Sequence, residues 1–247
     1  AAVAAAAPPP PTQPTAAAAG GSAGARALWQ ALCVRNEGVL HEDATLQIGV
    51  KMDFTNPGVG RIALYLGNKT TAPLTSVAAQ LSPCPAIAVQ ASALEPALAP
   101  RQQVVYQLQL ECLSAFADGP QIALRFINPA GPTQLVLPLP IVPSKFTVPM
   151  QLDSAEFFRR WKALDAQRKE DMKVFKLKGG VLDAQAASDV ITNHLKMAVL
   201  PGVDPNPDNF VGAGWLATKG ASPQAEAHSV LLRLEVNKQA GMCRVSV

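Results

Sequence analysis

The sequence predicts an α+β protein in which an antiparallel β-sandwich precedes a smaller domain of helices and strands. Two patterns along the chain support this. Apolar residues recur at every second position from about residue 27 to 147, and beyond Pro149 they recur with the spacing of a helix. A proline-rich segment, "PLPIVPSKFTVP" at 138–149, separates the two patterns. We therefore expect a β-sandwich at 27–147 and an α+β domain at 148–247.

The first 26 residues precede both patterns. Residues 1–25 carry no charge and are almost all Ala, Pro, Gly, Thr and Ser. A secretory signal would need a basic start, and the prolines at positions 8–11 and 14 would interrupt a membrane-spanning helix. We expect residues 1–26 to be a disordered hinge. Because the chain also begins without methionine, we expect it to be the end piece of a larger protein.

Half-buried strands account for the pattern in the first domain. Apolar residues alternate with polar or small ones at 46–54, 61–66 and 103–110. The turn signals Asn-Pro-Gly, Gly-Asn and Asp-Gly-Pro separate such runs. Since no helical period lies between the runs, we expect an antiparallel sandwich.

The second domain should begin with a helix. Asp153 and Glu156 have the spacing of a capping box, and the apolar residues Phe157, Trp161 and Leu164 then fall on one helix face. A second helix is expected near 167–177 and a short third helix near 183–192. Strands are expected around 194–200, 209–218, 228–236 and 242–247. The result would be an antiparallel sheet with flanking helices.

Composition and motifs argue against several functions. A formal charge of +3 on 247 residues is too small to indicate nucleic-acid binding by itself. The four cysteines include no Cys-x-x-Cys pair, so we expect free thiols in a reducing compartment. The three histidines lack the spacing of metal sites, and no motif for a serine nucleophile or a phosphate-binding loop is present. We therefore expect no enzymatic activity, no metal site and no cofactor.

One loop, "VDPNPDNFVGAGW" at 203–215, has the composition of a ligand site. Its acidic and amide residues at alternate positions match the opening of a calcium-binding loop. That loop needs Gly at its sixth position and Glu at its twelfth, and here these are Asn209 and Trp215. A phosphate cradle would need a helix after its glycines, whereas the residues after Asn209 predict a strand. We expect a structural turn that leads into a buried strand.

The last predicted hairpin carries its charges on one face. Arg233 and Glu235 point away from the apolar residues of "SVLLRLEV", and Arg244 does the same in "MCRVSV". One allowed register, with residue 235 opposite 242, sets Arg233 directly opposite Arg244. Like charges so placed are unfavourable unless they share an anion, so a bound carboxylate would complete the set. A solvated face with splayed arginines is the simpler explanation of the pattern alone.

The first helix of this domain has a similar ambiguity. Phe158 lies off the apolar face, beside Arg159, Arg160 and Lys162. An aromatic pair is ordinarily part of the core. However, a tryptophan such as Trp161, at the edge of a helix face and next to basic residues, is also typical of a peptide-binding hot spot.

Several sequence blocks, in order, resemble the appendage, or ear, of alpha-adaptin. They are "GVL…LQIG", "GR…GNKT", "FFRRWK", "VDPNPDNFVGAG" and "LLRLE" with Arg244 after it. The resemblance spans about residues 30–247. It implies an immunoglobulin-like β-sandwich joined to an α+β platform, with a flexible hinge before it. Alpha-adaptin is a large subunit of the heterotetrameric clathrin adaptor complex, so the resemblance implies a cytoplasmic location at plasma-membrane coated pits. It implies no nucleic-acid binding and no direct membrane binding by this part of the chain.

In this family the appendage is not catalytic and binds short linear motifs of disordered endocytic accessory proteins. The platform takes Asp-Pro-Phe, Asp-Pro-Trp and Phe-x-Asp-x-Phe motifs. Its binding residues carry over by resemblance to Phe158, Trp161, Arg233, Glu235 and Arg244. Aromatic walls would then hold the motif's ring, and the arginines would hold its aspartate.

The family has a second site on the sandwich, which takes Trp-x-x-Phe motifs. Its positions carry over to Tyr65 and Gln103, both of which face outward in the predicted strands. By the same resemblance, the loop at 203–215 is a turn and strand of the platform with no ligand of its own.

Two alternatives from other classes are retained. A hydrolase or other small-molecule enzyme on a two-domain scaffold would need a nucleophile and a base in a deep polar pocket, and the sequence offers no such pair. The appendage of another vesicle coat would share the sandwich and platform but not these sequence blocks.

Overall fold

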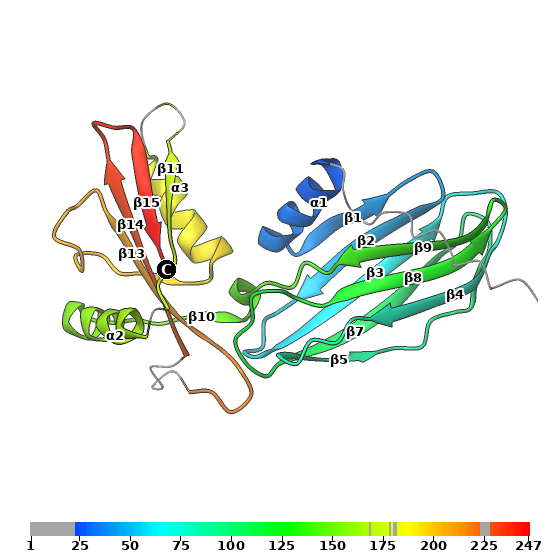
Figure 1. The fold of residues 1–247 in the computed structure, drawn as a ribbon, viewed down its shortest axis with the longest axis horizontal. Coiled ribbons are helices and arrows are strands. Elements are labelled where there is room, and N and C mark those ends of the chain that lie inside the picture. The colour runs from blue at the N-terminus through cyan, green and yellow to red at the C-terminus, as the bar shows by residue number, and fades with distance from the viewer. Residues whose placement is uncertain (1–22, 168, 178, 180–181, 223–227) are drawn as a thin grey trace, which may run out of the picture.

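The computed structural model describes residues 23–247 except 168, 178, 180–181 and 223–227. A β-sandwich and a smaller sheet flanked by helices lie side by side, and a short segment that includes strand β10 (Thr147–Pro149) joins them (Figure 1). The predicted α+β class is therefore confirmed. The smaller part is called the platform below.

The sandwich consists of two antiparallel sheets. One has the strand order β1-β2-β3-β7-β5 and the other the order β6-β4-β8-β9. The strands are β1 (Glu37–Glu42), β2 (Leu46–Asp53), β3 (Val59–Asn68), β4 (Leu74–Leu81), β5 (Ile87–Ala91), β6 (Ala97–Leu98), β7 (Gln103–Cys112), β8 (Gln121–Asn128) and β9 (Gly131–Pro138). Inward-facing residues such as Ile48, Leu64 and Leu108 are almost fully buried, which explains the strength of the period-two pattern.

A helix, α1 (Ala23–Val34), precedes the sandwich, and the prediction of strands without helical period from residue 27 is wrong here. Leu32 of this helix is buried, and the indole Nε1 of Trp29 donates to the carbonyl of Leu139 at 3.2 Å. The first turn falls inside the range predicted as a hinge, 1–26, of which residues 1–22 lie outside the described part. Alanine-rich sequence occurs in both linkers and helices. The tertiary contacts of Trp29 and Leu32 therefore decide that this segment is helical.

The platform is one antiparallel sheet between two helical layers. Its strand order is β10-β13-β14-β15-β11, with β12 paired to β13. The strands beyond β10 are β11 (Met172–Lys176), β12 (Ala198–Val199), β13 (Phe210–Leu216), β14 (Ser229–Asn237) and β15 (Met242–Ser246). The helices are α2 (Ser154–Ala166), α3 (Ala184–Asp189) and the single π-turn η3 (Val190–His194). The predicted first and third helices and the strands predicted at 209–218, 228–236 and 242–247 are confirmed, whereas the strand predicted at 194–200 is reduced to β12, because the π-turn extends to residue 194.

Each face of the platform sheet has its own apolar cluster. On one face, Phe157 of α2 packs on Val211, Ala213 and Leu231. On the other face, Ile191 of η3 packs on Leu232 and Met197. Because strand residues alternate between faces, Arg233 and Glu235 lie on the same face as Leu231, which is the face that α2 covers.

The helix predicted at 167–177 is wrong. The chain forms strand β11 there, and all five residues of this strand are exposed. Met172–Lys176 pairs antiparallel with β15, so the hydrogen bonds of the sheet decide the conformation of a segment whose charges fit a helix equally well.

The joint between the two parts is held by the short 3-10 helix η1 (Pro143–Phe146). Lys145 is buried, and its ammonium donates to the carbonyl of Arg35 at 2.6 Å and to the Oδ1 of Asn36 at 2.9 Å. The ring of Phe146 meets that of Phe54 edge-on, with 5.1 Å between centroids. Together these contacts fix the linker, and with it the start of the platform, against the sandwich.

Candidate functional site

Helix α2 presents both core and surface aromatics because of where it begins. The carboxylate of Asp153 accepts from the backbone N–H of Glu156 at 2.8 Å, which is the N-cap bond of the predicted capping box, whereas the Glu156 carboxylate accepts from Arg159 and Arg160. In that register Phe157 is fully buried, whereas Phe158 and Trp161 are only half-buried. The Trp161 ring lies 5.6 Å from that of Phe157 and is tilted by 31°. Phe157 is therefore the core residue, and Phe158 and Trp161 form the aromatic border of the platform face.

The three cations beside Phe158 do not have equal surroundings. Arg160 is buried; its Nε donates to Glu156 at 2.6 Å and its Nη1 to the hydroxyl of Ser229 on β14 at 2.8 Å. Hydrogen bonds from Arg159 and Arg160 lower the pKa of Glu156 to about 2. Arg160 thus attaches α2 to the sheet, and the exposed cations next to Phe158 are Arg159 and Lys162.

The predicted register of the last hairpin is wrong by two residues. Glu235, not residue 233, lies opposite Arg244, and Arg233 lies opposite Ser246. The Nε of Arg244 donates to the Oε2 of Glu235 at 2.6 Å. The two arginines are therefore not opposed, because a carboxylate stands between them.

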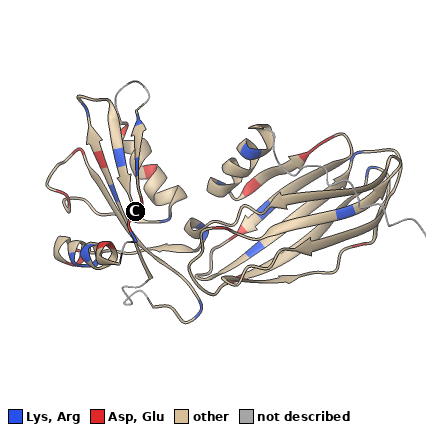
Figure 2. Ribbon diagram, in the orientation of Figure 1, with Lys and Arg blue, Asp and Glu red and all other residues tan. Residues whose placement is uncertain are grey.

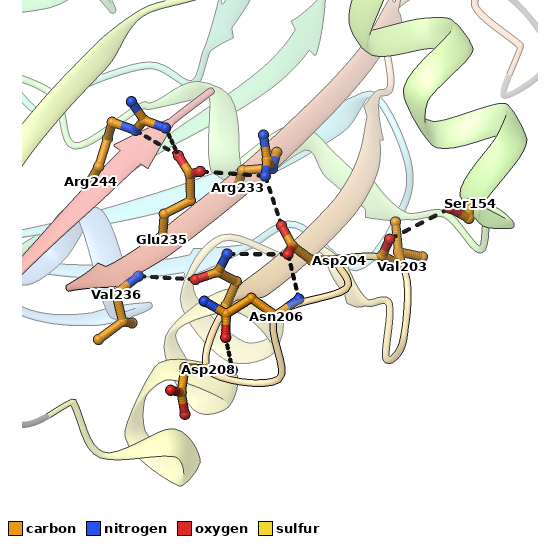
Figure 3. Close-up of polar contacts among 10 residues, drawn as sticks. Ser154, Val203, Asp204, Asn206, Asp208, Arg233, Glu235, Val236 and Arg244 are labelled. Carbon is orange, nitrogen blue, oxygen red and sulfur yellow. Dashed lines mark hydrogen bonds and ion pairs between the residues drawn. The ribbon is translucent and has the colours of Figure 1, made fainter. Parts of the chain in front are cut away.

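Arg233 has a second anionic partner that the sequence did not identify. Its Nη2 donates to the Oδ2 of Asp204 at 2.8 Å and lies 3.4 Å from the Oε1 of Glu235 (Figure 3). The Asp204 side chain is only 4% exposed. Burial raises the pKa of Asp204, but hydrogen bonds from Arg233, Asn206 and Asn209 outweigh it and hold that pKa below its usual value. The carboxylate that the arginines seemed to lack is thus supplied by the protein.

The loop that carries Asp204 is the "VDPNPDNFVGAGW" segment. Asp204 Oδ1 accepts from the backbone N–H of Asn206 at 2.9 Å and from the side chain of Asn209 at 3.2 Å. Asn209 in turn accepts from the backbone N–H of Val236 at 3.1 Å. The alternating acidic and amide residues therefore tie the loop to itself and to β14, as a structural turn should. The loop also contributes to the site, since Asp204 holds Arg233.

The Gly-x-Gly of this segment serves close packing. A Cβ atom at Gly214 would lie 2.7 Å from the Thr147 side chain and 3.0 Å from the Val148 carbonyl, both on the neighbouring strand β10. At Gly212 it would lie 3.0 Å from Ile191. Only glycine lets β10 and η3 approach the sheet this closely. Among the described residues, no group of histidine, cysteine, aspartate or glutamate side chains could hold a metal ion.

Arg233 also connects the charged and aromatic parts of the site. Its guanidinium lies 6.0 Å from the centre of the Phe158 ring, and its Nε is buried without a hydrogen-bond partner. Arg244 is more accessible, with 48% of its side chain exposed. Two arginines, two carboxylates and two half-buried aromatic rings therefore share one face of the platform. A peptide with an aromatic and an anionic side chain could place its ring on the aromatic residues and its carboxylate beside the exposed guanidinium of Arg244.

Tyr65 and Gln103 lie on the outer face of one sandwich sheet. Tyr65 on β3 is opposite Gly49 on β2 and Val105 on β7, and Gln103 is two residues from Val105. A Cβ at Gly49 would lie 3.9 Å from the Cδ2 of Tyr65, so the tyrosine ring rests against the glycine. Tyr65 is half-buried and Gln103 is exposed. The two predicted residues therefore share a face.

Two family models match consecutive parts of the chain. "Alpha adaptin AP2, C-terminal domain" covers residues 145–247, and "Adaptin C-terminal domain" covers residues 36–152. The chain belongs to the alpha-adaptin appendage family. The two family models meet where the sandwich passes into the platform, so each model describes one part of the appendage.

Curated relatives agree with this assignment. AP-2 complex subunit alpha-2 of Dictyostelium discoideum is 37% identical over 221 residues, which are 90% of this chain and 22% of that protein. AP-2 complex subunit alpha-1 of Arabidopsis thaliana is 32% identical over 186 residues, or 75% of this chain and 18% of that protein. The appendage thus spans about a fifth of the length of the relatives it matches. The GAE domain of GGA2p from Saccharomyces cerevisiae, a solved structure, is 12% identical with a TM-score of 0.38 and covers 44% of this chain and 100% of its own.

The family is one of adaptors rather than enzymes. Within the described residues, no helix has the length and hydrophobicity needed to span a membrane. Figure 2 shows acidic and basic residues distributed over both parts of the appendage, which agrees with the small net charge.

Proposed function

We propose that the appendage recruits disordered endocytic accessory proteins by binding short motifs, and that the platform face bounded by Phe158 and Trp161 is the principal site. The observation that carries the proposal is the position of Arg233. This arginine lies against the Phe158 ring, is held by Asp204, and keeps 26% of its side chain exposed. A cation fixed in this way, beside aromatic surfaces, suits a peptide with an aromatic ring and a nearby carboxylate.

The arginine charges should contribute less to peptide affinity than two unpaired arginines would. Asp204 and Glu235 already neutralise Arg233 and Arg244, so a motif aspartate would share these cations with internal carboxylates. Arg244 is the more exposed of the two and therefore the more accessible partner for that aspartate. The aromatic residues should consequently contribute more to affinity than the charge does, because burial of a ring does not require an existing ion pair to rearrange.

We further propose that the outer face around Tyr65 and Gln103 is a second site, which takes Trp-x-x-Phe motifs. The support is the open position at Gly67, opposite Gln103 and two residues from Tyr65, where an added Cβ would meet only the Gln47 carbonyl, at 3.8 Å. An indole ring could lie flat at this position and contact the tyrosine edge.

The relatives are AP-2 complex subunits, which leads us to propose that the parent protein joins a clathrin adaptor complex at plasma-membrane coated pits. Similarity to AP-2 alpha subunits favours this over the appendage of a different coat. The alternative of a small-molecule hydrolase has no support from the family.

Titration with two fluorescent peptides tests the proposal. One peptide carries Asp-Pro-Phe and Phe-x-Asp-x-Phe motifs and the other carries Trp-x-x-Phe, and scrambled peptides of the same composition serve as controls. Each motif peptide should bind and its scrambled control should not. Equal binding of motif and scrambled peptides would contradict motif recognition, and failure of both motif peptides to bind would refute the proposed function.

A further inference from the structure

The platform sheet ends in an edge strand that faces solvent. Among the described residues, β11 pairs only with β15, and no strand adjoins its other side. All five residues of β11 are exposed, including Met172 at 53%, Val174 at 54% and Phe175 at 50%. Edge strands of this kind offer unpaired backbone groups to another chain.

The hydrogen bonds to β15 identify which backbone groups are free. Asp171 and Val247 exchange both of their backbone hydrogen bonds, and Leu177 donates to Gly241. In an antiparallel pair such bonds recur at every second residue, so odd-numbered residues of β11 point their N–H and C=O groups toward β15. The N–H and C=O groups of Met172, Val174 and Lys176 therefore point outward from the sheet, in the spacing that an added strand requires.

The side chains around this edge are apolar and basic. Met172, Val174 and Lys176 lie on the α2 face, and Lys173 and Phe175 lie on the other. Within the strand there is no acidic residue, and the nearest one in the sequence is Asp171, whose carboxylate is 3.7 Å from Lys173. Lysine on an edge strand discourages pairing with another basic or apolar strand, but it favours an acidic one.

The edge is also continuous with the platform face. Val174 lies opposite Arg244, which lies opposite Glu235, so the three residues form one row across the sheet. A hollow of about 340 Å³ lies along this row and is lined by Val174, Met242, Arg244 and Glu235. Arg244 thus adds a third cation beside the edge, on the side where the hollow opens.

We infer that β11 is a docking edge for an extended, acidic and apolar peptide segment of a partner protein, which adds to the sheet as a further strand. The segment's backbone would bond to Met172, Val174 and Lys176. Its apolar side chains would cover Val174 and Phe175, and its acidic side chains would lie near Lys173, Lys176 or Arg244. This surface differs from the aromatic border of α2, and its use does not depend on motif binding there.

A peptide of four Glu-Val repeats is a suitable probe, because it contains no aromatic residue or proline and cannot imitate the platform motifs. Fluorescence anisotropy would measure its binding to the 247-residue chain. Two further versions of the peptide carry N-methyl groups, either on every valine nitrogen or on every glutamate nitrogen. In an added strand only every second backbone N–H points toward the sheet. Methylation of those nitrogens should lower the affinity at least about tenfold, whereas methylation of the other nitrogens should leave the affinity unchanged.

Matched variants place the contact on β11. Val174→Pro removes an outward N–H that β15 does not use. The variant should therefore keep the melting temperature of the unchanged protein but bind the peptide about tenfold or more weakly. Val174→Thr retains the N–H and should bind nearly as the unchanged protein does. Trp161→Ala should not affect this peptide, which separates the inference from the proposed platform site.

Several outcomes would overturn the inference. They are no binding of the unmethylated peptide at millimolar concentration, equal binding of both methylated versions, or equal binding by Val174→Pro. A dimer in sedimentation that Val174→Pro dissociates, without peptide binding, would assign the edge to a second copy of the chain instead. If Val174→Pro lowers the melting temperature, the methylated peptides still decide the question.

Discussion

The guanidinium of Arg233 is held by the carboxylate of Asp204, with Nη2 and Oδ2 2.8 Å apart, and this pair joins β14 to the loop before β13. We expect Asp204→Asn to lower the free energy of unfolding by roughly 1–3 kcal/mol at pH 7, because a buried charged donor loses its anionic partner. Urea unfolding measures this. Asp208→Asn is the matched control, since Asp208 is on the same loop but forms an exposed pair with Lys238. Equal losses in both variants would contradict a special role for Asp204.

The same pair should give a pH dependence. The pKa of Asp204 is lowered in the folded protein, so its stabilisation is present above the unfolded value of about 3.9 and is lost as the pH falls through the folded value. Melting temperatures between pH 7 and 2 should therefore fall less steeply in Asp204→Asn than in the unchanged protein below about pH 4. Parallel curves would show that Asp204 does not titrate with folding.

The two aromatic residues Phe157 and Trp161 should separate folding from binding. Phe157 is fully buried, so Phe157→Ala should cost about 3–5 kcal/mol of stability. Trp161 is half-buried, and Trp161→Ala should cost less stability but weaken the Asp-Pro-Phe peptide by about 2 kcal/mol or more. Thermal melts and peptide titrations on both variants check this. Trp161 would be a core residue if its variant lost as much stability as the Phe157 variant.

Tyr65 should act only at the sandwich. Tyr65→Ala should weaken the binding of Trp-x-x-Phe peptides and leave the binding of Asp-Pro-Phe peptides unchanged. The reason is that Tyr65 lies on the sandwich and the aromatic border lies on the platform (Figure 1). Gln103→Ala should have a smaller effect in the same direction. Isothermal titration with both peptides on each variant measures this. Loss of both activities in Tyr65→Ala would mean that the residue supports the fold instead.

Lys145 should make stability rise at alkaline pH. Burial lowers its pKa to about 8, so between that value and the unfolded value of about 10.4 the unfolded chain binds more protons. The contribution of this residue to stability therefore increases as the pH rises from about 8 to 10. Lys145→Met should remove this increase, whereas Lys162→Met, on an exposed face of α2, should retain it. Urea unfolding at pH 7.5, 8.5 and 9.5 tests the difference.

Much of the fold could be predicted because burial imposes a period on the sequence. Strands β2, β3 and β7 each bury alternate residues, and the N-cap at Asp153 fixes which aromatic residue of α2 is buried. These are local consequences of one buried face or one terminal hydrogen bond, and they do not depend on distant residues. The resemblance to alpha-adaptin rests on the same kind of local evidence.

Other features depend on partners that are distant in the sequence. Helix α1 needs the Leu139 carbonyl for Trp29, and the conformation of β11 depends on pairing with β15. Each of these segments has a sequence that fits more than one local structure. Tertiary contacts supply the free-energy difference that intrinsic propensity leaves small.

The sequence by itself determined which residues share the charged face of the last hairpin, and the tertiary structure decided which of them meet. A slip of two residues leaves every side chain on its original face, so the apolar pattern cannot distinguish Arg233 opposite Arg244 from Glu235 opposite Arg244. The closed hairpin selects the second arrangement, in which opposite charges pair across the strands. The loop before β13 then brings in Asp204, 29 positions away from Arg233, which no periodicity could indicate.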